Sequence, residues 1–129
     1  MKNKTVLGLL MAATVAFSAS SAMAASKGEK LFKHKCSVCH KIDKNAVGPM
    51  LKGVIGRKAG SVASFSRYNA MKGANFTWNE ALISEWITNQ RKFLKTHKDM
   101  VGGSRTAMIV HIKKEKDRKA IIDYLKTAQ

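Results

Sequence analysis

The amino-acid sequence predicts an all-α domain in which three main helices and long loops surround something other than their own side chains. Apolar residues recur at helical spacing in three segments, and the alternation typical of strands is convincing nowhere. The stretch 41–76, between the first two of these segments, shows no clear period. Compact domains seldom carry loops this long without a use for them. Because three short helices would make a poor apolar core, we expect another group to fill the centre.

The N-terminal residues 1–24 are expected to be a cleaved secretory signal peptide. Two lysines precede an apolar run at 6–17, and residues 22–24 (Ala-Met-Ala) fit the small-x-small pattern of a cleavage site, with Ala25 as the second choice. The run is shorter than the roughly 20 residues that span a bilayer, which disfavours a permanent anchor. The remaining domain, 25–129, would work in the periplasm, where free cysteines are normally oxidised.

The first predicted helix covers residues 27–37. Ser26 and Glu29 have the spacing of a capping box, in which each side chain bonds the backbone N–H of the other residue. Leu31 and Phe32 follow at helical spacing.

Two more helices are predicted after the long loop. Thr77 and Glu80 repeat the capping-box spacing, and the apolar residues behind them predict an amphipathic helix that ends near Asn89. A last helix is predicted over 116–127, with one apolar face and one basic, solvated face. The apolar face comprises Ala120, Ile121, Tyr124 and Leu125.

The strongest motif is C-S-V-C-H at residues 36–40, which has the C-x-x-C-H attachment signature of c-type haem. Thiols three positions apart near a helix end, here Cys36 and Cys39, reach both vinyl groups of one porphyrin as thioethers. The adjacent His40 then places its imidazole beneath the iron as an axial ligand.

The cysteine pair has two other possible functions. A C-x-x-C pair also occurs in thiol–disulfide redox proteins and as half of a zinc site. The first would need a βαβ context, which is absent, and the second would need another Cys/His pair. Only His34, His97 and His111 remain, and they are scattered. With a signal peptide and a missing core, the motif predicts one covalent haem c with its iron.

Beyond this motif, residues 26–127 resemble the class I cytochromes c, close to the bacterial cytochrome c2/c550 and mitochondrial-type group. Gly28 and Phe32 match the family's glycine/aromatic pair in the first helix, and Tyr124 matches the facing aromatic of the last helix. The glycine-rich loop 48–60 matches the family's loop after the haem motif. The resemblance implies the small cytochrome c fold, wrapped around one covalently attached haem.

The resemblance also implies roles for residues near the haem. Pro49 stands where a proline carbonyl accepts a hydrogen bond from the ligand histidine, which would orient His40 and raise its basicity. Arg57 matches an arginine near a haem propionate, and Trp78 matches an indole that donates to one, although plain core packing would also explain this tryptophan. Thr106 aligns with a threonine whose hydroxyl can reach a propionate.

A methionine must be the sixth ligand if the resemblance holds. Residues 112–115 (Ile-Lys-Lys-Glu) match a further motif of the family, and Met108 stands four residues before it, which is the spacing in cytochrome c2 members. We therefore predict Met108 as the ligand, with Met100 as the alternative. Met50 and Met71 lie in the first long loop. Thioether ligation opposite histidine raises the reduction potential and closes the iron to outside ligands.

Some positions depart from the family pattern. A tyrosine that usually reaches a propionate is replaced by Arg67, with Tyr68 one position later, so either the loop shifts by one or Arg67 takes over the role. Trp86 replaces a common tyrosine of the second helix. We therefore expect the hydroxyl usually found near the methionine ligand to be missing.

The charge points to an anionic partner. Lys plus Arg outnumber Asp plus Glu by 24 to 8, a formal +16, and loss of the signal peptide with its two lysines leaves +14. Nucleic acid is not expected, because no base-reading motif accompanies the charge. The resemblance implies docking on acidic faces of membrane redox complexes, with membrane contact only through them, by a monomer. Candidate docking residues are Lys35, Lys41, Lys44, Lys95 and Lys98.

The resemblance implies a soluble periplasmic one-electron carrier and not an enzyme. It would take electrons from a bc1-type complex and pass them to a terminal oxidase, a photosynthetic reaction centre or a reductase. The alternative is a haem peroxidase or the cytochrome subunit of a periplasmic dehydrogenase. Peroxidase chemistry needs an open sixth position and a distal acid–base group, and ligation by Met108 argues against the open position.

Overall fold

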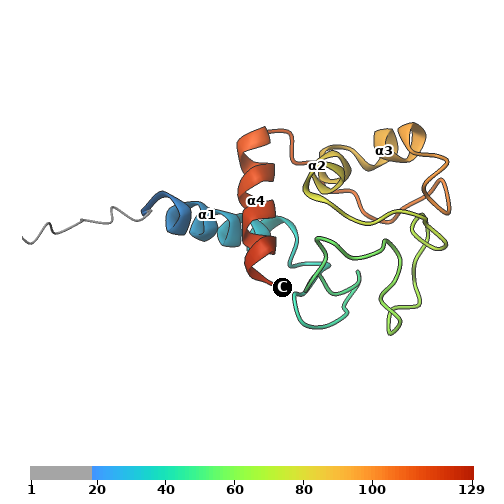
Figure 1. Cartoon of the computed structure of the whole chain (residues 1–129), viewed down its shortest axis with the longest axis horizontal. Coiled ribbons are helices and arrows are strands. Elements are labelled where there is room, and N and C mark those ends of the chain that lie inside the picture. Colours follow the sequence, from blue (N-terminus) through green and yellow to red (C-terminus); the bar gives the residue numbers. More distant parts are fainter. Residues whose placement is uncertain (1–18) are drawn as a thin grey trace, which may run out of the picture.

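The structure is a computed structural model that describes residues 19–129. Its helices are α1 (Ala19–Lys35), α2 (Glu80–Thr88), α3 (Gln90–Thr96) and α4 (Glu115–Thr127). Over this range the backbone forms no strand, and Lys58 and Thr77 make an isolated antiparallel bridge. The predicted all-α class with long loops is confirmed. Figure 1 shows α1 and α4 crossing on one side of the molecule, with α2 and α3 on the other side and the long loops below them.

The predicted signal peptide lies mainly outside the described residues and stays a prediction. Within 19–129, no helix combines the length and the apolar character that crossing a membrane requires.

The crossing of α1 and α4 depends on a residue without a side chain. A Cβ built on Gly28 would lie 1.9 Å from the carbonyl oxygen of Ala120, so the two helix backbones touch at this point. The Phe32 and Tyr124 rings meet one turn away, with centroids 5.3 Å apart. An ion pair of 2.8 Å between Lys27 and Asp117 completes the contact.

Replacing Gly28 by alanine is expected to destabilise the fold by about 1–3 kcal/mol, because the helices must separate to admit the methyl group. Urea unfolding followed by far-ultraviolet circular dichroism measures the effect. Lys30→Ala, at an exposed position of the same helix, serves as the control. Equal unfolding midpoints for the two variants would show that the crossing tolerates a side chain.

Two predicted helix starts are wrong. The first helix begins at Ala19 instead of 27, so Ser26 lies within α1 and is not its cap. The alanine-rich residues before it favour helix strongly, which explains the extension. α2 is capped by Asn79, whose side chain accepts a hydrogen bond from Leu82 N at 2.8 Å, and not by Thr77. Thr77 is already held in the bridge to Lys58, which keeps it in extended backbone.

The helix α3 was not predicted. Asn89 ends α2 as predicted, but its side chain also accepts a hydrogen bond from Lys92 N at 2.9 Å and so caps α3. Because Asn89 alone separates the two helices, no loop marks the boundary between them in the sequence. The last helix begins at Glu115 and ends at Thr127, one residue longer than predicted.

An aromatic cluster joins α2 and α3 to the loop before them. The rings of Phe76, Trp78, Trp86 and Phe93 lie with centroids 4.8–6.1 Å apart. All four side chains are buried. Trp78 and Trp86 of this cluster line the cavity described next.

Candidate functional site

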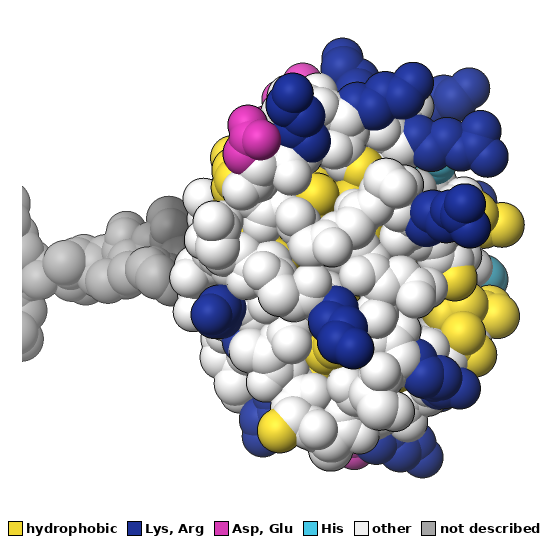
Figure 2. Space-filling model, turned by 90° about the vertical axis from the view of Figure 1, so that its right-hand side faces the viewer, with side chains coloured by type: hydrophobic (Ala, Val, Ile, Leu, Met, Phe, Trp, Pro, Cys, Tyr) yellow, Lys and Arg dark blue, Asp and Glu magenta, His cyan; other side chains and the backbone are white. Residues whose placement is uncertain are grey.

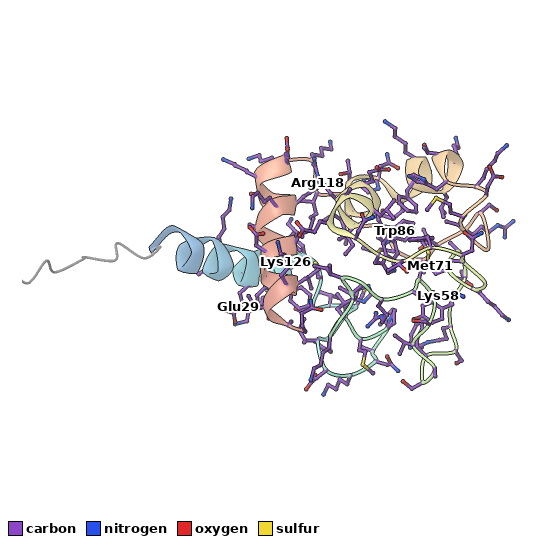
Figure 3. All side chains as sticks on the ribbon, viewed as in Figure 1. Glu29, Lys58, Met71, Trp86, Arg118 and Lys126 are labelled. Atoms are coloured by element: carbon purple, nitrogen blue, oxygen red, sulfur yellow. The ribbon has the colours of Figure 1, made fainter. Side chains whose placement is uncertain are left out.

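A cavity of about 250 Å³ lies between the helices and the loops, with mostly apolar walls. In Figure 3, Trp86 and Met71, which both line it, lie between α2 and the loops below. The residues singled out from the sequence all line this one cavity. They are Cys36, Cys39, His40, Pro49, Arg57, Trp78, Thr106 and Met108.

The cysteines are presented by a turn that continues α1. Cys36 N donates to Phe32 O at 2.8 Å, and His40 N donates to Cys36 O at 2.8 Å. Burial raises the pKa of the Cys36 thiol to about 11, and Cys39 adds to the shift. A thiol this hard to ionise is a poor redox nucleophile, which disfavours the thiol–disulfide reading. Residues 27–129 also hold no cluster of three or more Cys, His, Asp and Glu side chains that could bind zinc.

His40 is held in the form that ligates a metal. Its Nδ1 lies 2.9 Å from the carbonyl oxygen of Pro49, and since that oxygen can only accept, Nδ1 donates. Burial lowers the pKa of His40, against the effect of the Pro49 hydrogen bond, and the charge of Arg57 lowers it further. The ring is therefore neutral, with the lone pair of Nε2 free for a metal.

Gly48 leaves room for this ring. A Cβ built on Gly48 would lie 2.4 Å from His40 Cε1 and 2.7 Å from Nδ1. The backbone N–H of Gly48 also donates to Cys39 O at 2.8 Å, which ties the loop to the cysteine turn.

Arg57 and Trp78 lie side by side at another part of the cavity wall. Trp78 N donates to Arg57 O at 2.9 Å, and Gly56 N donates to Trp78 O at 2.7 Å. The half-buried guanidinium of Arg57 donates to Lys52 O and Met50 O at 2.8 and 2.9 Å. Burial lowers the pKa of Arg57.

The positive charge of Arg57 fits an anionic group of a cofactor. Among the described residues, none of the ion pairs includes Arg57. A partly desolvated cation is costly unless an opposite charge or hydrogen bonds compensate it. A haem propionate would supply that charge, so the donor set fits haem c at this end as well as at the cysteine turn.

Arg67 and Tyr68 both line the cavity. The Tyr68 hydroxyl accepts a hydrogen bond from Val62 N at 3.2 Å and keeps its own proton free to donate. The Arg67 guanidinium donates to the carbonyl of Ala46 and lies 5.5 Å from the centroid of the Phe65 ring. Each side chain thus ties two parts of the loop wall together.

The four methionines of residues 25–129 differ in whether they line the cavity. Met71 and Met108 line the cavity, whereas Met50 and Met100 are not among its lining residues. Met71 is buried in the core, while Met108 is half-buried and follows a turn in which Thr106 Oγ1 accepts from its backbone N–H at 3.1 Å.

A donor does face the Met108 sulfur. Trp86 Nε1 donates to Met108 Sδ at 3.1 Å. Trp86 brings no hydroxyl to this position, as its residue type predicts, and its indole N–H supplies a hydrogen bond to the sulfur in place of one. The sequence signal was the residue type itself, since tryptophan carries a donor at its edge.

Basic side chains line this cavity and a second cleft that shares Thr106, Met108 and Ile109 with it. Val47 and Ile109 line the cavity and are 62% and 84% exposed. Lys35 also lines the cavity, and a second, open cleft of about 840 Å³ beside α3 includes Lys95. Figure 2 shows Lys and Arg predominating on one face, with few acidic groups and an apolar patch at its edge. The other basic residues of the open cleft are Arg91, Lys92, Arg105 and His111.

Comparisons with known proteins agree on one family. A sequence model of that family, cytochrome c, matches residues 25–129. The chain is 41% identical to a cytochrome c2 of Rhodopseudomonas palustris, over 80% of this chain and 96% of that one. It is 39% identical to cytochrome c of Gibberella zeae, over 78% and 90%.

Solved structures give the same result. The fold matches ferricytochrome c2 from Rhodopseudomonas palustris with a TM-score of 0.70 and 34% identity, covering 81% of this chain and 98% of that one. It matches cytochrome cH from Methylobacterium extorquens with a TM-score of 0.66 and 36% identity, covering 80% and 97%.

Proposed function

The chain belongs to the cytochrome c family, whose members are electron carriers with covalent haem c, and we propose that it is a periplasmic one-electron carrier ligated by His40 and Met108. One observation carries the ligand assignment. The neutral imidazole of His40, fixed by Pro49, and the sulfur of Met108 line the same cavity as both cysteines. A haem in this cavity would therefore meet one nitrogen donor, one thioether donor and two points of covalent attachment.

Each side chain has a separate task in this proposal. Cys36 and Cys39 would hold haem c through thioether bonds, and His40 Nε2 would ligate the iron. Arg57, with Trp78 beside it, would compensate the charge of a propionate in a partly buried place. When bound, the haem supplies an iron that gains or loses one electron.

The Met108 sulfur would be the second side-chain ligand of the iron, so no substrate need reach it. This is why we favour the carrier over a peroxidase or a dehydrogenase subunit. Neither His97 nor His111, the candidates for peroxidase acid–base work, is among the residues that line the cavity. His97 Nε2 lies 2.7 Å from Glu85 Oε2 and packs against Phe93, and His111 lines the outer cleft instead.

The proposed periplasmic location depends on the predicted signal peptide. Cleavage after Ala24 would release residues 25–129 into the periplasm, as a monomer. The cut leaves the Gly28 crossing of α1 and α4 intact and brings Ser26 to the start of the helix, where its capping-box spacing to Glu29 can act. The mass of the exported holoprotein identifies the cleavage site, and a retained N-terminus would contradict the proposal.

Electron transfer to acidic partners should slow as salt is added, because screening weakens the attraction that speeds encounter. We expect the bimolecular rate constant with a bc1-type complex, an oxidase or a reaction centre to fall about tenfold or more between low and physiological ionic strength. Stopped-flow kinetics across a salt series, with each isolated complex in turn, measures this and ranks the partners.

Charge-reversal variants locate the docking face. Lys95→Glu, at the open cleft, should lower the rate at low salt more than Lys119→Glu, which makes the same change of net charge on α4. Equal effects would mean that only net charge matters and that the α3 end is not the docking face.

A further inference from the structure

The segment 108–112, which carries Met108, is attached to α2 and α3 through residues 108, 110 and 112. Three hydrogen bonds make the attachment. Trp86 Nε1 donates to Met108 Sδ at 3.1 Å, Gln90 Nε2 donates to Val110 O at 2.6 Å, and Ile112 N donates to Ile87 O at 2.8 Å.

Exposure follows the same period of two. Ile109 and His111 are exposed, Met108 and Val110 are half-buried, and Ile112 is buried. An extended segment turns successive side chains to opposite sides. The inward positions of this segment therefore meet the helices, and the outward ones face solvent.

Gln90 is the central connection. Its side chain is 1% exposed, and its Nε2 donates to Trp86 O at 2.7 Å as well as to Val110 O. One amide thus joins the residue that contacts the Met108 sulfur to the residue two positions after Met108. Both N–H donors of the amide are used, and they face carbonyl groups, which fixes its orientation.

The other end of the same amide is left without a partner. Gln90 Oε1 is the one fully buried side-chain acceptor without a hydrogen bond in the part of the chain that the structure describes. An unpaired buried acceptor costs free energy. An apolar residue at this position would avoid that cost, so the glutamine is not explained by core stability alone.

We propose that Gln90 is a positioning residue that keeps Met108 on the iron by holding the 108–112 segment against Trp86. The inference rests on the ligation of iron by Met108 proposed above. Removing the amide donors should free Val110 and raise the fraction of molecules in which Met108 has left the iron. An outside ligand then binds more tightly, because its apparent affinity scales with the fraction of the open form.

The test uses ferric holoprotein carrying Gln90→Leu, which removes both donors and the unpaired acceptor at similar volume. Imidazole is the probe, titrated by visible absorbance. We expect its apparent affinity to rise by up to about tenfold, the effect of losing the one hydrogen bond that joins Gln90 to Val110 O. The urea midpoint should stay the same or rise. Thr96→Leu, at an exposed position of α3 that lines neither the cavity nor the open cleft, is the control and should bind imidazole like the wild type.

A second variant, Gln90→Asn, keeps the amide but shortens its reach, and should raise the imidazole affinity in the same direction. It replaces Gln90→Leu if that variant does not fold. The proposal is overturned if imidazole affinity stays at the wild-type value, or if it rises only in proportion to a fall in the urea midpoint. If the wild type itself lacks the methionine–iron band, ligation by Met108 fails. If the band is present and imidazole affinity does not move, only the role of Gln90 fails.

Discussion

Met108→Ala abolishes the weak red charge-transfer band that methionine–iron ligation gives to ferric haem c, and it lowers the reduction potential. The physical reason is the loss of the thioether, which favours reduced iron when it stands opposite histidine. The sulfur lines the cavity with an indole N–H at 3.1 Å, and Met108 is the single methionine of residues 104–112. Visible absorbance and a potentiometric titration of the purified holoprotein measure both effects.

Two matched variants sharpen this result. Met100→Ala should keep the band, because Met100 is not among the cavity-lining residues. Met71→Leu should also keep it, although Met71 lines the cavity, since its side chain is core packing in the present assignment. Loss of the band in either variant, with retention in Met108→Ala, would move the sixth ligand to that methionine.

Gly48→Ala should leave most of the exported protein without correctly ligated haem. The added methyl group would lie 2.4 Å from His40 Cε1, so the ring must move and give up its 2.9 Å hydrogen bond to Pro49. A displaced imidazole loses its orientation and part of its basicity as a ligand. The ratio of haem to protein absorbance, together with the spin state of the ferric form, measures the damage.

Gly53→Ala is the control in the same loop. Gly53 has φ of +68°, but a Cβ there meets nothing within 4 Å. That variant should lose about 1–2 kcal/mol of stability through backbone strain and keep its haem. Wild-type haem content and a low-spin spectrum in Gly48→Ala would contradict the assigned role of the glycine.

The features that the sequence predicted are those encoded by short spacing or by residue type. The C-x-x-C-H turn needs only five successive residues, and the helix crossing is indicated by Gly28, Phe32 and Tyr124. The cavity-lining positions came from resemblance to a family, and the structure places them around one space.

The features that could not be predicted from the sequence depend on contacts between distant residues. Thr77 has a good capping sequence, but its bridge to Lys58 moves the cap to Asn79. The hydrogen bond from Trp86 to Met108 and the bridging amide of Gln90 join residues some twenty positions apart. No local period encodes such pairs, and they appear only once α2 and the methionine segment are packed together.

The ferric spectrum of the wild-type holoprotein at neutral pH tests the proposed iron site most directly. Low-spin haem with the methionine–iron charge-transfer band is the predicted result, because His40 and Met108 would occupy both axial positions. A high-spin spectrum would mean that the sixth position is open, and that result would contradict the electron carrier and favour a peroxidase.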